Sequence, residues 1–303
     1  MLNHLMFAIL PIIVTIALGY LAAVKGMFDD HDSQKLVKLV MSFMLPMSVF
    51  AGIWGTPRKI IIEDIPLAGW LIVSMIGSYF LLMIINKYIF HADSQIGLLR
   101  AMSVAMPSVP FIGSAILPPL FGASVSAITI GICSLVINVV MVPTAYAVLS
   151  EAESFGHRVI STLKKPLVFS ALFGFGFALV GWQMPEQLSG SFTLLGQGAG
   201  GLAIFATGVV LYTQKLLVNR TIFVTVFLKN VLFPILVWAA MLAFNVPSEL
   251  RRIVVVTLAI PTAVMPTNLG IQFNINRSEL ASTQFLSTVC SAVTLAVFLV
   301  VLG

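Results

Sequence analysis

AMPSVPFIG, residues Ala105–Gly113, interrupts one long apolar segment with two prolines, and AIPTAVMPTNLG, residues Ala259–Gly270, interrupts another. The first prolines of the two stretches, Pro107 and Pro261, lie 154 residues apart. A proline has no amide hydrogen and clashes with the preceding turn, so two of them at membrane depth free several backbone groups that lipid cannot satisfy. Such breaks in both halves of a chain are typical of the substrate site of a secondary transporter.

The composition indicates a polytopic membrane protein. Of the 303 residues, 59% are hydrophobic and only 9% charged, and the mean hydropathy is +1.07. These values lie outside the range of soluble domains. The net charge of +5 comes from Lys and Arg residues in short connections between apolar segments, so it reports membrane topology and no nucleic-acid partner. Cys133 and Cys290 lie inside apolar segments and are interpreted as core residues; neither a cofactor nor a metal is expected.

A helix needs about 20 apolar residues to cross the hydrocarbon. By that measure the sequence predicts an all-α integral membrane fold with ten transmembrane helices, at 5–24, 36–54, 65–85, 96–117, 126–149, 166–182, 191–211, 222–244, 253–273 and 281–302. Lys and Arg concentrate in the connections after the first, third, fifth, seventh and ninth segments, which predicts that these connections are cytoplasmic. Both termini are therefore expected on the extracytoplasmic side.

The polar stretch at the middle of the chain predicts a 5+5 inverted repeat. It divides the sequence into a first five-helix repeat at 1–150, a cytoplasmic linker at 151–165 and a second five-helix repeat at 166–303. A shift of 155 residues places Pro11 on Pro166 and Gly19 on Gly174. Because each half has an odd number of spans, the two copies run in opposite directions through the membrane. Within the linker, residues 155–165 form either an amphipathic segment on the membrane surface or a plain solvated connection.

The broken helices suggest a site for an anion. A break exposes the N-terminus of the second half-helix, where free N–H groups and the macrodipole favour negative charge. Neutral side chains would add donors, so a carboxylate could be held without a formal positive charge. The alternative is that these side chains only satisfy the freed backbone. The predicted substrate-binding residues around the two breaks are Pro107, Ser108, Pro110, Asn138, Pro261, Thr262, Pro266, Thr267 and Asn268.

Two further residues join this set. Lys229 is the one charged residue well inside a span, which marks it as a candidate functional residue. Three interpretations stay open: it reaches the cytoplasmic interface, it neutralises the C-terminus of a half-helix, or it pairs with the substrate. Gln197 lies in the glycine-rich stretch Gly196–Gly201, which suits close helix packing, and is expected to line a cavity between two parts of the protein.

No acidic residue is predicted at mid-membrane, because all of them lie in loops or at helix ends. Cation antiporters ordinarily need such a carboxylate, so a sodium/proton exchanger is not expected. The four histidines also lie outside the spans, which leaves no acid-base pair for an intramembrane enzyme.

The chain resembles the auxin efflux carrier family along its whole length. The likeness rests on Leu10-Pro11 and Gly19-Tyr20, on Lys38-Leu39-Val40 and Leu45-Pro46, on Asn138 through Pro143, on Phe205-Ala206-Thr207-Gly208, on Leu228-Lys229 through Pro234, and on Pro261 to Asn276 leading into Ala281-Ser282. Bacterial members of this family include malonate and malate carriers, and plant members export auxin. Relatives often carry an asparagine and a glycine beside the first break, where this chain has Ser108-Val109-Pro110-Phe111.

The resemblance implies a fold similar to the sodium/proton antiporters and the bile-acid symporters, in which helices 4 and 9 unwind and cross at mid-membrane. Helices 1, 2, 6 and 7 would form a scaffold, and helices 3–5 and 8–10 a transport domain that moves by an elevator or rocking mechanism. It also implies a homodimer. The short loops suggest the bacterial inner membrane.

The sequence thus predicts a secondary transporter, and no enzyme, for a small organic anion such as malonate or malate. Coupling to H+ or Na+ stays open. One alternative is a potential-driven exporter of auxin-like acids, which needs a larger and more apolar cavity. A second alternative is a membrane solute sensor that transports nothing.

Overall fold

The computed structural model describes residues 14–149, 166–213 and 217–302. The predicted linker at 151–165, with its surface segment at 155–165, and the start of the first predicted helix lie outside these residues. Within them every element is helical, and a single pair of residues forms a β-bridge.

Helices occupy all ten predicted segments. In chain order they are a helix at Val14–Val24; α2 (Asp30–Leu39), η1 (Val40–Met44) and α3 (Leu45–Trp54); the short α4 (Arg58–Glu63); α5 (Ile65–Tyr88); α6 (Ser94–Ala105), η2 (Val109–Gly113) and α7 (Ser114–Phe121); α8 (Ala123–Leu135), η3 (Val136–Met141) and α9 (Val142–Leu149); α11 (Pro166–Val180); α12 (Glu186–Gly196) and α13 (Ala199–Thr213); α14 (Arg220–Phe227), η4 (Leu228–Leu232) and α15 (Phe233–Ala243); α16 (Ser248–Ala259) and α17 (Met265–Gln272); and α18 (Arg277–Leu302).

Six of these helical stretches are long and apolar enough to cross a membrane: His31–Trp54, Ile65–Tyr88, Ala123–Leu149, Gln187–Val210, Arg220–Ala243 and Arg277–Leu302. The helices Val14–Val24 and Pro166–Val180 are apolar but shorter. The remaining two predicted segments are the broken ones, because α6 and α16 end where the first proline of each stretch stands.

Three helices widen into a π-helical turn just before a proline. The residue preceding Pro46, Pro143 or Pro234 donates its backbone N–H to the carbonyl five positions back: Leu45 to Val40, Val142 to Ile137, and Phe233 to Leu228. A proline cannot donate to the carbonyl four positions back, and its ring pushes that carbonyl away. A wider turn keeps the neighbouring backbone groups bonded, as a membrane interior requires.

The acidic residues lie at helix ends, as predicted, except Glu151 and Glu153, which lie outside the described residues. Asp29 and Asp93 accept backbone N–H groups as N-caps of α2 and α6. Asp64 stands at the start of α5, where burial and then the nearby Glu63 and Glu249 raise the pKa of its carboxyl group.

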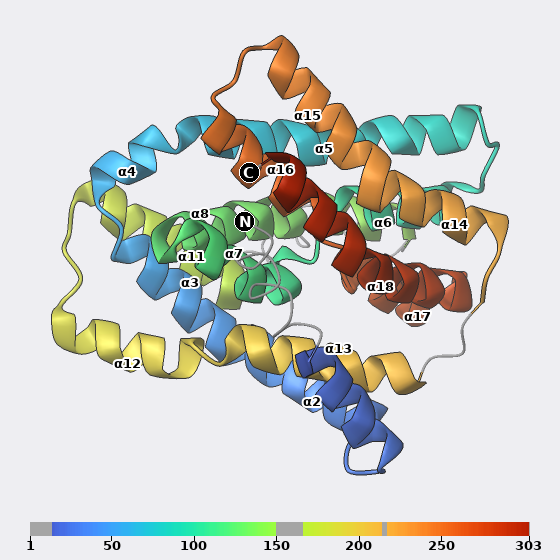
Figure 1. The fold of residues 1–303 in the computed structure, drawn as a ribbon, viewed down its shortest axis with the longest axis horizontal. Helices are drawn as coiled ribbons and strands as arrows, with labels where there is room; N and C mark the ends of the chain where they lie inside the picture. The colour runs from blue at the N-terminus through green and yellow to red at the C-terminus, as the bar shows by residue number, and fades with distance from the viewer. Residues whose placement is uncertain (1–13, 150–165, 214–216, 303) are drawn as a thin grey trace.

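The helices pack into two groups. The helix Val14–Val24 lies against α13, and α2 and α3 pack on α11, α12 and α13. The other group joins α5 and α6 with the helices from α14 to α18. In Figure 1, α12 and α13 run along one edge and α5 along the opposite edge, with α7 and α8 between them. The α8 helix contacts both groups, through α3 and α11 on one side and α5 on the other.

The closest approach within the first group is between Gly19 and Gly208. A Cβ atom on Gly208 would overlap the backbone oxygen of Ile16 and would lie 3.0 Å from the backbone nitrogen of Tyr20. Backbone atoms cannot move aside as a flexible side chain does, so only glycine lets these two helices touch.

Gly208→Ala is therefore expected to destabilise the protein by about 1–3 kcal/mol, the usual effect of overpacking. Thermal unfolding in detergent measures it. Gly201→Ala, in the same helix α13, is the matched control because a Cβ atom there meets nothing within 4 Å. Equal melting temperatures for the two variants would contradict the close contact.

Candidate functional site

The two proline breaks meet inside the protein as an antiparallel β-bridge between Pro107 and Thr262. The Ser108 N–H donates to the Pro261 carbonyl at 2.8 Å, and the Ala263 N–H donates to the Met106 carbonyl at 3.0 Å. Each break thus satisfies backbone groups of the other, as a non-helical segment at membrane depth requires. The helices η2 and α17 begin two and three residues beyond the bridged pair.

The Thr262 side chain supplies a hydrogen-bond donor to the last turn of α6, the first half-helix. Its Oγ1 donates to the Ser103 carbonyl at 2.6 Å, and both residues are buried. Ser103 stands four positions before Pro107, so its carbonyl is the one that the proline ring displaces from the helical ladder. The hydroxyl group of Thr262 therefore satisfies the backbone of the opposite break.

The Thr262 backbone N–H is satisfied in turn by two neighbouring helices. It donates to Ser287 Oγ in α18 at 3.0 Å, and Ser287 Oγ donates to Asn230 Oδ1 in η4 at 2.6 Å. Asn230 Nδ2 donates to the Ser287 carbonyl at 2.7 Å. Asn230 and Ser287 are both fully buried, so every polar group in this chain of contacts depends on the others.

Lys229 binds the other end of the same break. Its side chain is fully buried, and Nζ donates to the Leu258 carbonyl at 3.0 Å. Leu258 lies in the last turn of α16, where carbonyl groups lack helical partners and carry partial negative charge. Nζ also lies 5.5 Å from the centroid of the Phe233 ring. Of the three interpretations of Lys229, the contact matches neutralisation of a half-helix C-terminus, and the burial contradicts a side chain that reaches the interface.

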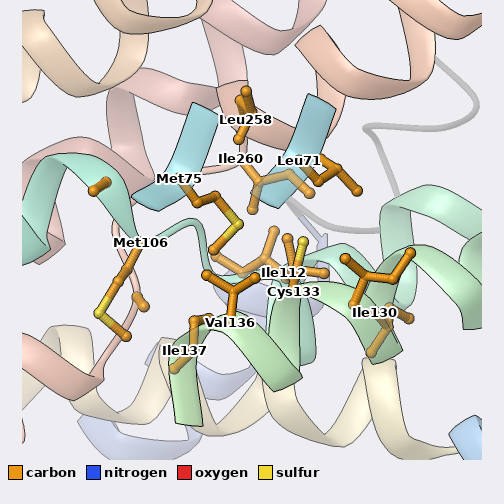
Figure 2. Packing of buried hydrophobic residues seen from close by; sticks show 14 of the residues in the cluster. Leu71, Met75, Met106, Ile112, Ile130, Cys133, Val136, Ile137, Leu258 and Ile260 are labelled. Carbon is orange, nitrogen blue, oxygen red and sulfur yellow. The ribbon is translucent and has the colours of Figure 1, made fainter. Parts of the chain in front are cut away.

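The place where the two breaks meet, at Pro107 and Thr262, is called the crossing below. Apolar side chains enclose it. Figure 2 shows Leu258 and Ile260 from the second break together with Ile112 from the first and Cys133 and Val136 from the neighbouring helix. These residues are buried. The polar groups of the crossing therefore lie in an apolar surrounding, where hydrogen bonds and helix-end charges act more strongly than in water.

Among the remaining predicted residues, some bind backbone carbonyl groups with their side chains and others do not. Thr267 Oγ1 donates to the Leu280 carbonyl at 3.3 Å, and Asn138 Nδ2 donates to the Ser134 carbonyl at 2.9 Å. For Thr262 and Thr267, the structure favours the interpretation that the side chain satisfies backbone. Ser108 is a buried residue whose hydroxyl group does not cap η2 and has no hydrogen bond within the described residues, and Asn268 is exposed. Pro110 and Pro266 occupy the first turns of η2 and α17, where a missing N–H costs little.

A cavity of about 570 Å³ lies between α3, the junction of α12 and α13, and the helices α7 and α8. Gln197 lines it, with Ser48, Ser114 and Thr193. No charged or aromatic residue is among the described residues that line it. The wall is mostly glycine and alanine; for example, a Cβ atom on Gly200 would lie 3.0 Å from Ala115.

Ser103, Asn230, Ser287 and the hydroxyl groups that line the cavity were not predicted as site residues from the sequence. A signal for two of them is visible. Asn230 follows Lys229 inside the same apolar segment, and Ser287 lies on a helix that repeats serine at Ser282 and Ser291. Ser103 has no such signal, because its backbone carbonyl makes the contact and any residue type supplies one.

The profile of the family described as membrane transport protein matches residues 4–155 and 154–299. The chain belongs to this family, which includes the auxin efflux carriers. The uncharacterized transporter YfdV of Escherichia coli (strain K12) is 26% identical over 283 residues, which cover 91% of this chain and 90% of that protein. Auxin efflux carrier component 8 of Arabidopsis thaliana is 23% identical over 346 residues, covering 92% of each chain. Auxin efflux carrier component 2 of the same plant is 24% identical over 148 residues, covering 46% of this chain and 23% of that protein.

Membership of the auxin efflux carrier family agrees with the chemistry of the crossing. The described residues offer helix ends, one hydroxyl group and neutral amides, with Lys229 behind the second break. The family is one of membrane transporters, and the described helices are long and apolar enough for that role.

Proposed function

We propose that this member of the auxin efflux carrier family is a secondary transporter of a small organic anion, with a dicarboxylate such as malonate or malate as its substrate. The observation that carries the proposal is the hydrogen-bonded contact between the two proline breaks. It brings the start of one half-helix from each half of the chain to one buried place. Helix N-termini attract carboxylate groups, and discontinuous helices form the substrate site in many secondary transporters.

In this proposal the chain crosses the inner membrane of a bacterium ten times, with both termini on the extracytoplasmic side. Residues 1–150 and 166–303 form the two inverted repeats. The scaffold consists of the helix Val14–Val24 with α2, α3 and α11 to α13, and the transport domain of the other long helices. The two packing groups support this division. Alternating access then moves the crossing past the scaffold, within a homodimer.

The substrate carboxylate is proposed to bind at η2 and α17, with Ser108, Asn268 and Gln197 as additional donors. Ser108 is the best placed of these because it stands at the start of η2 and the protein leaves its hydroxyl group free within the described residues. Coupling to H+ would use the carboxyl group of the substrate itself, and coupling to Na+ would use neutral oxygens, because the described acidic residues lie at helix ends.

The cavity supports an auxin-like aromatic acid as a second candidate substrate. Its volume of about 570 Å³ is within the range of pockets that hold drug-sized ligands, and no charged residue lines it among those described. A dianion would need more positive charge than such a wall offers, whereas an aromatic monoanion would fill the space with its ring.

Currents from proteoliposomes on a solid-supported membrane test both candidates. The purified protein is challenged with malonate, malate, succinate, acetate and indole-3-acetate at fixed and varied pH. A saturable current with the dicarboxylates supports the first proposal, and one with indole-3-acetate alone supports the second. No current with any of them, together with no exchange of the radiolabelled acids across the liposome, would contradict transport of these anions.

Ser108→Ala is expected to raise the KM for the transported anion about tenfold, with little change in the maximal rate, because one donor to a charged group is lost. Counterflow of the labelled anion measures both values. Ser134→Ala is the matched control, since Ser134 is also buried but donates to the Ile130 carbonyl of its own helix. A KM that stays unchanged in Ser108→Ala would remove Ser108 from the site.

A further inference from the structure

Two side chains that do not line the cavity hold the second break in its shape. Ser287 Oγ accepts the Thr262 N–H at 3.0 Å, and Asn230 Oδ1 accepts the Ser287 hydroxyl at 2.6 Å. Asn230 Nδ2 closes the ring by donating to the Ser287 carbonyl at 2.7 Å. The contacts join two helices, η4 and α18, to the break after α16, and Asn230, Ser287 and Thr262 are all buried.

The π-helical turn η4 is what allows this arrangement. It carries Lys229 and Asn230 in succession, and these two neighbours bind opposite ends of the same break: Leu258 before Pro261 and, through Ser287, Thr262 after it. A single turn of one helix therefore fixes both sides of the interruption. Pi-helical turns within α-helices often occur at functional positions.

The two breaks differ in the hydrogen-bond donors that remain free to bind a solute. In the second break, the Thr262 N–H is bound by Ser287 and the Thr262 hydroxyl by the Ser103 carbonyl. In the first break, the Ser108 hydroxyl has no partner among the described residues. Both donors of Thr262 in the second break are thus taken by the protein, and Ser108 in the first break retains a hydroxyl donor.

We infer that Asn230 and Ser287 form a clamp that keeps the second break rigid, and that this Asn230–Ser287 clamp sets the rate of transport without contacting the solute. The inference rests on the proposed transport function. Neither residue lines the cavity, and their side chains form hydrogen bonds to each other and to Thr262. Through Thr262 and its bond to the Ser103 carbonyl, the clamp also holds the first half-helix α6 in place. Asn230 and Ser287 are positioning residues.

The test uses the full-length protein with Ser287→Ala, Ser287→Thr and Asn230→Ala, and Ser291→Ala as matched control. Ser291 lies one turn further along α18, is buried, and donates to the Thr288 carbonyl of its own helix. Counterflow in proteoliposomes gives KM and the maximal rate for the anion found active with the wild type. Hydrogen exchange of peptides that cover residues 258–266 reports the Thr262 amide without any solute.

Ser287→Ala and Asn230→Ala are expected to lower the maximal rate about tenfold, which corresponds to about 1.4 kcal/mol, with KM within twofold of the wild type. Exchange at the Thr262 amide is expected to speed up by a similar factor. Ser287→Thr keeps a hydroxyl group and should restore much of the rate, and Ser291→Ala should match the wild type in both measurements.

A tenfold rise in KM at an unchanged maximal rate would overturn the inference, because it would place the clamp against the solute. Unchanged exchange at 258–266 in Ser287→Ala would overturn it as well, and so would an equal loss of rate in Ser291→Ala. If the wild type transports none of the anions, the proposed function fails by itself, and the exchange measurement still decides whether the clamp holds the break.

Discussion

Lys229→Met is expected to lower the transport rate by one to two orders of magnitude while the protein still folds and inserts. Methionine preserves the aliphatic volume but removes the bond to the Leu258 carbonyl and the positive charge at the end of α16. A hydrogen bond from a charged donor contributes about 1.5–3 kcal/mol, which spans this range of rates. Counterflow in proteoliposomes measures the rate, and size-exclusion chromatography in detergent confirms the fold.

The kinetic constants of Lys229→Met distinguish between neutralisation of the α16 C-terminus and direct pairing with the anion. A lower maximal rate at constant KM is expected if Lys229 neutralises the C-terminus of α16, and a raised KM is expected if it pairs with the anion. Lys87→Met is the matched control, because Lys87 lies exposed in the last turn of α5 with its Nζ 5.5 Å from the Tyr88 ring centroid. Wild-type transport by Lys229→Met would show that the charge has no role in the crossing.

Arg100→Met is expected to destabilise the protein by about 2–3 kcal/mol, since it leaves a partly buried carboxylate without its charged partner. Arg100 Nε donates to Glu279 Oε1 at 2.7 Å, and Nη2 donates to Oε2 at 3.0 Å. The two side chains are only 23% and 14% exposed, so water screens the pair little. The bidentate contact joins α6, which leads into the first break, to the start of α18, which carries Ser287.

Thermal unfolding of the purified protein measures this loss. The double variant Arg100→Glu with Glu279→Arg is expected to recover part of it, because the pair is restored with its charges exchanged. The Lys59–Glu63 pair supplies the control: its atoms lie 3.8 Å apart on side chains that are 84% and 61% exposed, so Lys59→Met should leave the melting temperature unchanged. A melting temperature of Arg100→Met equal to that of the wild type would contradict a stabilising role for the contact.

The positions of the helices were predictable because composition and proline chemistry act locally. Apolar runs of the required length coincide with helices in the structure, and α6 and α16 end two residues before Pro107 and Pro261, where the sequence places the breaks. The ten membrane crossings and the inverted repeat stay predictions. The family resemblance is confirmed by the profile that covers nearly the whole chain.

The partners of the site residues were less predictable because they depend on which helices are neighbours. Thr262 was expected to face a solute, but its hydroxyl group donates to the Ser103 carbonyl, which Pro107 cannot bind because it has no N–H group. Nothing in the spacing of Asn230 and Ser287 shows that they meet, since 57 residues separate them. Gln197 lines a cavity because the small residues on both sides of it leave space between the helices, and its role toward a solute stays a prediction.

The widened turns before Pro46, Pro143 and Pro234 each accommodate one residue more than an α-helical turn. One additional residue rotates the rest of a helix by about 100° about its axis. The two halves of each such helix therefore present different sequence positions to the same neighbour, and a helical wheel drawn through η1, η3 or η4 assigns half of the faces wrongly. Deleting one residue within such a turn would therefore return the helix to regular periodicity and leave its distal half facing its present neighbours, whereas a deletion elsewhere in the same helix would rotate that half by about 100°.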